Sequence, residues 1–209
     1  PEMINVDSEL YQIHPDWSID IPNRDHSEGR NQRILDYTND EVTDYIIEKM
    51  TEVFSSGNIT YVKWDMNRIF SDYYSKTLSN KKQFSVAHRY CRGLYTVMKE
   101  LTKRFPHILF EGCASGGNRF DLGILCYFHQ IWSSDDTDAL CRAQMQHNYS
   151  YGYPLSVVGA HVSNIPNHQT LRKTSIETRF NVAAFGIFGY ELNLVDIKEE
   201  DKKAIKAQI

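Results

Sequence analysis

Short apolar runs alternate along the chain with longer stretches in which apolar residues recur every three or four positions. The clearest longer stretch covers residues 83–104, where one apolar residue falls on each turn of a helix. Alternation of short strands with amphipathic helices is typical of parallel β-α-β units. The pattern therefore predicts an α/β protein with a parallel sheet. The apolar stripe of the helix at 83–104 consists of Val86, Tyr90, Leu94, Val97 and Leu101.

Six of the short runs have the length and composition of strands. Polar residues gather just after them, as they do at the carboxyl-end rim of a TIM-type barrel, where active sites lie. Such a barrel needs eight strands, so we expect an incomplete (β/α)8 TIM-type barrel containing about strands 3 to 8. The six runs are residues 33–36, 59–64, 107–110, 130–133, 155–158 and 188–192. The rim residues are Asp36, Asp65, Cys113, Asp135 and His161.

Three further helices are predicted between these runs. The first begins after Thr38 or Asn39, either of which can cap it. The others cover residues 137–149 and 171–185. No repeat or Pro/Gly/Ser-rich linker divides the sequence, so residues 1–209 are expected to form a single domain. The apolar face of the first helix consists of Val42, Ile46, Met50 and Val53.

Composition and charge exclude some classes of partner. The 209 residues are 41% hydrophobic and carry a net charge of −4, which disfavours binding to nucleic acid. No stretch reaches the ~18 apolar residues that span a bilayer, so no membrane partner is expected. The four cysteines form no Cys-x-x-Cys pair, and so few cysteines fit reduced thiols and a cytoplasmic location.

A charged and aromatic cluster, Lys63-Trp64-Asp65-Met66-Asn67-Arg68, follows a β-rich run without a spacer. The neighbouring lysine favours the ionised form of the Asp65 carboxylate, and an ionised carboxylate at a rim can act as a nucleophile. The alternative is an exposed strand end with an ordinary Lys–Asp pair.

A second cluster, residues 132–138, places three acids within four positions. Repulsion and partial burial can raise the pKa of one of them, as a general acid requires. The alternative is a helix N-cap, and both can hold, with Asp136 or Thr137 capping and Asp135 doing chemistry. Two acids after separate strands can flank a glycosidic bond, and hydrolysis of a glycoside needs such a pair.

Two other features carry less chemistry. The glycine-rich segment 111–121 allows close backbone approach to a ligand but lacks the lysine of a phosphate-binding P-loop. His161 and His168 form no His-Glu-x-x-His motif, which disfavours a zinc site.

Five motifs follow one another along the chain: KWDMN (63–67), CASGG (113–117), WSSDDTDA (132–139), GAHVS (159–163) and PNHQT (166–170). With these motifs in this order, the sequence resembles glycoside hydrolase family 36, whose bacterial members are mostly α-galactosidases. The resemblance runs over nearly the whole chain, and it implies that residues 1–209 are the C-terminal larger part of a catalytic barrel. Three departures are Asn118, where the family often has a third glycine, Phe128-His129, where a proline is common, and the absence of the family's double-Asp motif. The five motifs are the most specific part of the resemblance.

The resemblance implies roles for individual residues. Asp65 matches the nucleophile, and Asp135 matches the acid/base. The implied reaction is hydrolysis of terminal α-1,6-linked galactose from melibiose- or raffinose-type sugars with retained configuration, without a metal or organic cofactor. The full-length protein is implied to be a homo-oligomer, as a tetramer. The implied sugar-binding residues are Arg30, Lys63, Trp64, Asn67 and Cys113.

Three alternatives remain open on the sequence alone. The chain can be an inactive fragment with a broken galactose pocket, or a carbohydrate-binding protein on a hydrolase scaffold. It can also transfer galactose to another sugar instead of to water. No residue in the sequence decides between hydrolysis and transfer.

Overall fold

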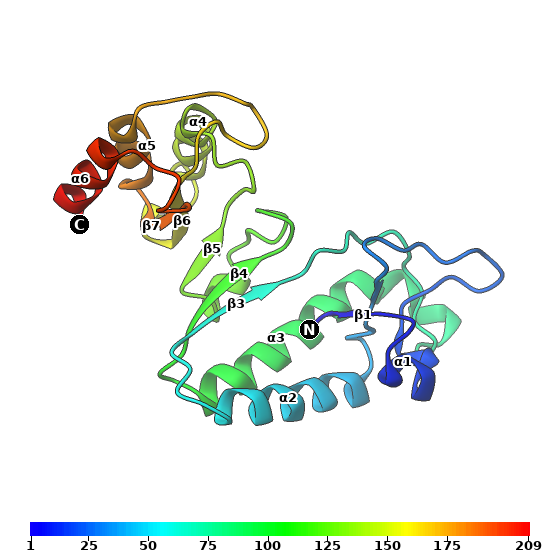
Figure 1. Cartoon of the computed structure of the whole chain (residues 1–209). Helices are drawn as coiled ribbons and strands as arrows, with labels where there is room; N and C mark the ends of the chain where they lie inside the picture. Colours follow the sequence, from blue (N-terminus) through cyan, green and yellow to red (C-terminus); the bar gives the residue numbers. More distant parts are fainter. The chain divides into compact units, whose positions relative to one another are not determined.

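The computed structural model describes all residues from 1 to 209 (Figure 1). The chain forms two compact units. The first unit comprises Pro1–Ser115 and Asp121–Phe128, and the second comprises Gly116–Phe120 and His129–Ile209. The expectation of one domain stays a prediction.

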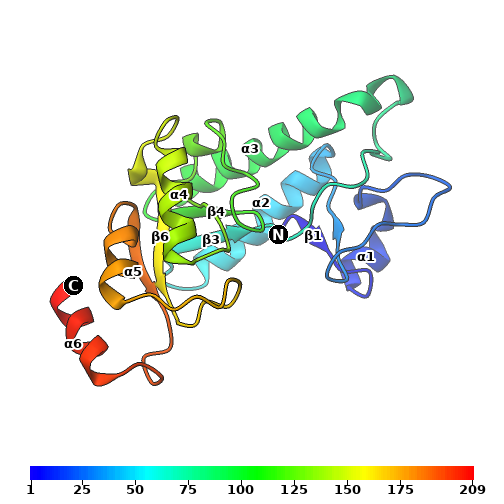
Figure 2. The ribbon, with the colours of Figure 1, turned by 90° about the horizontal axis from the view of Figure 1, so that it is seen from above.

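The first unit contains a parallel strand pair with two long helices against it. Strand β3 pairs with β4 in a register that sets Lys63 opposite Glu111 and Asp65 opposite Cys113. The two helices, α2 and α3, lie side by side along this pair in both ribbon views (Figure 1 and Figure 2). The elements are β1 (Met3–Ile4), α1 (Glu9–Ile13), β2 (Arg33–Ile34), α2 (Asp40–Ser55), β3 (Tyr61–Asp65), α3 (Val86–Arg104) and β4 (Leu109–Cys113).

Helix α3 follows directly from its apolar stripe. All five predicted stripe residues are buried, which confirms the predicted face. A 3-10 turn, Asn80–Ser85, replaces the first turn that the sequence predicts. A methyl group at Gly93 would lie 1.9 Å from the carbonyl oxygen of Tyr37, so only glycine permits this close approach.

Helix α2 begins as expected. The Asn39 side chain accepts a hydrogen bond from the backbone N–H of Glu41, which makes Asn39 the cap. Its predicted apolar face is partly wrong, because Val53 is 47% exposed and Phe54 is buried in its place. Phe54 packs edge-on against Phe105 and Phe110, and these aromatic contacts outweigh the simple helical period.

The second unit contains three parallel strands and three helices. Strand β6 pairs with β5 on one side and with β7 on the other. The core of this second unit is formed by Ala160, Val162, Ile176, Ala183 and Ile205. The elements are β5 (Gln130–Trp132), α4 (Ala139–Tyr149), β6 (Val158–Ser163), α5 (Ile176–Ala183), β7 (Ile187–Glu191) and α6 (Glu199–Gln208).

Three predicted elements differ from those observed. The run 33–36 pairs antiparallel with β1, so it is not one of the parallel strands. The run 155–158 begins as a 3-10 turn, Leu155–Val157, and the strand starts only at Val158. The helix predicted from 171 starts at Ile176, because Ser175 caps it by accepting a hydrogen bond from the N–H of Thr178.

None of the helices is both long and apolar enough to cross a membrane. No disulfide joins the four cysteines, Cys91, Cys113, Cys126 and Cys141.

Candidate active site

The alternation of side chains along β3 sorts the Lys-Trp-Asp cluster onto two faces. Successive side chains of a strand point to opposite sides of the sheet, so Lys63 and Asp65 share one face and Trp64 lies on the other. Registered pairing with β4 places Glu111 and Cys113 beside Lys63 and Asp65.

Asp65 is the last residue of β3 and is partly buried. Its Oδ2 accepts a hydrogen bond from the Asn67 side-chain amide, and Ser115 donates to the other end of that amide over 3.4 Å. The second carboxylate oxygen, Oδ1, is buried and has no hydrogen-bond partner. One oxygen is therefore held by Asn67, while the other receives no hydrogen bond from the protein.

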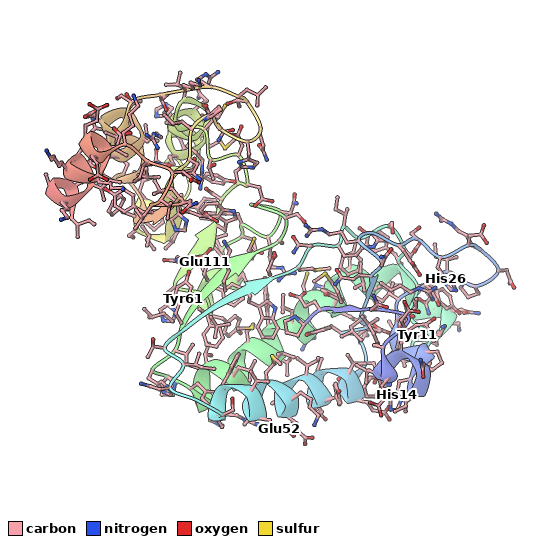
Figure 3. All side chains as sticks on the ribbon, in the orientation of Figure 1. Tyr11, His14, His26, Glu52, Tyr61 and Glu111 are labelled. Carbon is pink, nitrogen blue, oxygen red and sulfur yellow. The ribbon has the colours of Figure 1, made fainter.

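Lys63 forms an ion pair with Glu111, whose carboxylate is almost fully buried. The Nζ of Lys63 lies 3.1 Å from Oε1 of Glu111, and the Tyr61 hydroxyl donates to Oε2 of the same carboxylate. Figure 3 shows Tyr61 and Glu111 lying together on the neighbouring strands β3 and β4. Glu111 was not among the site residues predicted from the sequence, although a charged residue directly after an apolar strand run is unusual. Cys113, opposite Asp65, is buried.

Trp64 lies where it supports the strand and does not line the rim. Its side chain is only 1% exposed, and its indole N–H donates to Oε1 of Glu2 over 2.8 Å. The ring therefore packs behind β3, on the face opposite Asp65. The sugar-binding role that the resemblance implies for Trp64 stays a prediction, and the burial of the ring on the face opposite Asp65 argues against it.

Arg30 lies at the tip of a tight turn. It is exposed, and its backbone has a φ of 56°, as Asn31 has a φ of 57°. Gly29 and Gln32 close the turn by exchanging backbone hydrogen bonds of 3.2 and 3.0 Å. Asn67, by contrast, touches Asp65 directly.

Asp36 does not belong with the candidate catalytic groups. Its carboxylate is fully buried and accepts hydrogen bonds from the side chains of Thr38 and Ser75. Burial raises its pKa, although these hydrogen bonds act in the opposite direction. Asp36 ties the start of α2 to the segment around Ser75.

Asp135 lies in the loop after β5 and is exposed to solvent. Its Oδ1 accepts a hydrogen bond of 2.8 Å from the indole N–H of Trp132. The indole itself is fixed by the Arg142 guanidinium over one side, 4.6 Å from the ring centroid, and by the His161 ring at 4.9 Å. His161 in turn lies 3.1 Å from Glu191 on β7.

Two glycines pack against the loop that carries Asp135. A methyl group at Gly117 would lie 2.3 Å from the carbonyl oxygen of Ser133 and 2.7 Å from the Tyr149 hydroxyl. A methyl group at Gly116 would lie 3.1 Å from the backbone nitrogen of Asp135. The Gly-Gly pair predicted to approach a ligand therefore also braces the candidate acid from behind.

The third acid of this cluster has a structural role. Asp138, and not Asp136 or Thr137, caps α4 by accepting from the N–H groups of Leu140 and Cys141. It also pairs with Arg172 and accepts from Thr170. Burial alone would raise its pKa, but these hydrogen bonds and the arginine outweigh it and lower the pKa. A carboxyl that is held ionised in this way is a poor proton donor.

A model of the Melibiase family matches residues 1–209, which is the whole chain. The chain belongs to the Melibiase family. Its sequence is 53% identical to α-galactosidase AgaA of Geobacillus stearothermophilus and 48% identical to α-galactosidase 1 of Pediococcus pentosaceus, in both cases over 209 residues. The resemblance to glycoside hydrolase family 36 is thereby confirmed.

Solved structures of Melibiase relatives confirm the fold class. Two variants of the AgaA enzyme, one with raffinose and one with stachyose bound, match this chain with a TM-score of 0.96 and 52% identity. An α-amylase from Lactobacillus plantarum, 13% identical with a TM-score of 0.55 over 92% of this chain, shares the fold alone. The expected part of a TIM-type α/β barrel is therefore present.

This Melibiase chain covers only a part of its relatives. It spans 29% of AgaA and 28% of the Pediococcus enzyme. Both relatives are α-galactosidases, which are glycoside hydrolases.

Proposed function

We propose that this chain forms part of a retaining α-galactosidase that removes terminal α-1,6-linked galactose from raffinose- and melibiose-type sugars. The carrying observation is the buried Oδ1 of Asp65, which has no hydrogen-bond partner while Oδ2 is held by Asn67. An ionised carboxylate with one free oxygen is suited to attack an anomeric carbon.

In the proposed reaction, Asp135 donates a proton to the leaving glycosidic oxygen while Asp65 attacks the anomeric carbon. Asp135 then removes a proton from water, which attacks the glycosyl-enzyme and frees galactose with its configuration kept. The exposure of Asp135 supports this role, because the attacking water must reach the carboxylate in the second step and restore its proton. A retaining mechanism predicts that the two carboxyl groups lie roughly 5–5.5 Å apart.

The AgaA complexes support the choice of these two residues. In the raffinose complex one aspartate is replaced by asparagine, and in the stachyose complex another is replaced by alanine. The two replaced aspartates are separated by as many positions as Asp65 and Asp135 are in this chain.

Four further residues of this chain belong to the proposed site. Lys63, Asn67, Cys113 and Arg30 are proposed to bind sugar hydroxyls around Asp65. Lys63 and Asn67 are supported by their place on or just after β3, on the side of Asp65. Trp64 is not included as a stacking platform. No metal or organic cofactor takes part in the proposed reaction.

Product analysis of the intact protein tests this function. Incubation with raffinose should release galactose and sucrose, and proton NMR should detect α-galactose first, before mutarotation. β-Galactose as the first product would contradict retention. Added acceptor sugars distinguish hydrolysis from transfer, since a transferase would form a new galactoside in place of free galactose. The isolated chain should show little or no turnover in the same assay, because it covers less than a third of its relatives.

We also propose that the intact protein is a cytoplasmic homo-oligomer, as a tetramer. Four cysteines without a disulfide fit a reducing compartment. Light scattering coupled to size-exclusion chromatography tests the oligomeric state, and a mass of one subunit would contradict it.

A further inference from the structure

Arg68 ends the cluster that begins at Lys63, and the proposed reaction gives it no task. Its guanidinium donates to the carbonyl oxygen of Ser27 over 2.7 Å and to that of Gln32 over 3.3 Å. It also donates to the Ser71 hydroxyl over 2.8 Å and to the carbonyl of Ile69. One side chain therefore joins the segment after Asp65 to a segment about forty residues earlier in the chain.

The earlier segment is the turn that carries Arg30. Gly29 and Gln32 pair across it, and both residues between them have positive φ, which is the geometry of a type I′ turn. An arginine at positive φ is uncommon, because its Cβ crowds the backbone there. Such a turn needs contacts from outside itself to stay in one conformation.

Arg68 supplies those contacts on both sides of the turn. It binds Ser27 before the turn and Gln32 at its end, and its aliphatic part packs against the backbone between them. A methyl group at Gly29 would lie 3.1 Å from Cδ and 3.5 Å from Nε of Arg68. The planar fork of a guanidinium can reach several carbonyls at once, which a lysine ammonium cannot do in the same geometry.

We propose that Arg68 is a positioning residue that fixes the Arg30 turn to the segment carrying Asp65. The Arg30 side chain and the Asp65 carboxylate are thereby held at a fixed distance from each other, although they are far apart in the sequence. The kinetic part of this inference rests on the proposed function, because it assumes that Arg30 binds the sugar. The structural part, that Arg68 holds the turn, does not.

Hydrogen–deuterium exchange on the intact protein tests the structural part. Arg68→Met should speed exchange of the backbone amides at 27–32 by at least about tenfold, since each lost charge-assisted hydrogen bond corresponds to that factor or more. Arg68→Lys should resemble Arg68→Met if the fork, and not the charge alone, holds the turn. Arg104→Met is the matched control, because Arg104 binds only Thr51 on α2, and it should leave exchange at 27–32 unchanged. Equal thermal unfolding of the three variants by circular dichroism would show that the fold is kept.

Steady-state kinetics on raffinose test the link to Arg30. Arg68→Met should raise KM about tenfold with kcat changed less than about threefold, as expected when an interaction of equal strength in ground and transition state is lost. In an Arg30→Gln background the same change should have almost no effect on KM, because both substitutions remove one function. Additive effects would contradict the link.

The outcomes separate the two proposals. Unchanged exchange at 27–32 together with an unchanged KM overturns the role of Arg68 and leaves the proposed α-galactosidase activity standing. Absence of any galactosidase activity in the wild-type protein overturns the proposed function, while the exchange experiment still decides whether Arg68 holds the turn.

Discussion

The end of β3 and the loop after β5 each carry one candidate catalytic aspartate, in contrasting surroundings. Asp65 closes a strand that pairs in register along its length, and it is partly buried beside Asn67. Asp135 lies beyond the end of its strand, is exposed, and is oriented by the Trp132 indole. A nucleophile needs a fixed position, whereas an acid/base must be reached by the water that it deprotonates. The difference therefore matches the two proposed roles.

Rigidity also has different origins in the two places. Sheet hydrogen bonds hold Asp65, while side-chain packing holds the loop of Asp135. That packing comes from Arg142 over the Trp132 ring and from the glycine pair beneath the loop. A loop without sheet hydrogen bonds can therefore hold a candidate catalytic side chain in place when its neighbours pack closely against it. Four substitutions test this contrast.

The largest effect is expected at Asp65. Asp65→Asn should lower kcat/KM for raffinose by roughly 10⁴- to 10⁶-fold, because removal of a nucleophile removes the covalent route. Asp44→Asn, at an exposed position on α2, is the matched control and should keep full activity. Mass spectrometry of the intact protein with a slow fluorinated galactoside should detect a glycosyl-enzyme in wild type and none in Asp65→Asn. A labelled adduct in the variant would remove Asp65 from the nucleophile role.

Asp135→Asn should have the next largest effect, and one that depends on the substrate. Hydrolysis of raffinose should fall about 10²- to 10⁴-fold, the range that a general acid contributes. The first step on an aryl galactoside with a good leaving group should be almost spared, because such a group needs little protonation. Burst-phase kinetics measure that step. Unchanged raffinose hydrolysis would point to Asp136, since Asp138 is committed to capping α4.

Gly117→Ala tests whether packing holds the acid loop. The new methyl group would meet the Ser133 carbonyl oxygen, and the loop must move to relieve this. We expect a loss of about 1–3 kcal/mol in unfolding free energy and roughly a tenfold to hundredfold loss in kcat/KM. Gly152→Ala is the control, because nothing lies within 4 Å of a methyl group there. Equal behaviour of the two variants would show that the loop tolerates displacement.

The smallest effect concerns Asp138 and changes with pH. Asp138→Ala should cost about 1–2 kcal/mol near neutral pH through loss of the cap. Because the folded protein lowers the pKa of this carboxyl, its charge stabilises the fold above the unfolded pKa of about 3.9 and ceases to do so as pH falls through the folded value. The difference between wild type and variant in urea unfolding should therefore narrow in acid. Asp138→Asn keeps a capping oxygen and should cost less at neutral pH.

The helices and strands with a clear period were predictable from the sequence. The α3 stripe is buried at every predicted position, because one continuous face meets the core. The run 155–158 was predicted wrongly, because a short apolar segment has no period that separates a 3-10 turn from a strand. The antiparallel partner of 33–36 was also missed, since β1 is only two residues long.

Less of the candidate site than of the fold could be predicted from the sequence. Motif resemblance named Asp65, Asp135 and Trp64, but only strand pairing and burial show that Trp64 lies on the opposite face from Asp65. Glu111 and Arg68 could not be assigned from the sequence, because their roles depend on which backbone segments fold next to them. The cap of α4 was misassigned between neighbouring acids, as Asp136, Thr137 and Asp138 all have side chains that suit an N-cap.

The oxygen of Asp65 that lacks a donor also bears on how the protein divides stability from reactivity. A buried acceptor without a donor generally costs about 1–3 kcal/mol, and no protein group donates to Oδ1 of Asp65. Formation of a covalent bond from this oxygen to the sugar would remove that cost, so the cost applies only while substrate is absent. Variants selected only for heat resistance are therefore expected to lose this carboxylate first, and catalytic competence with it.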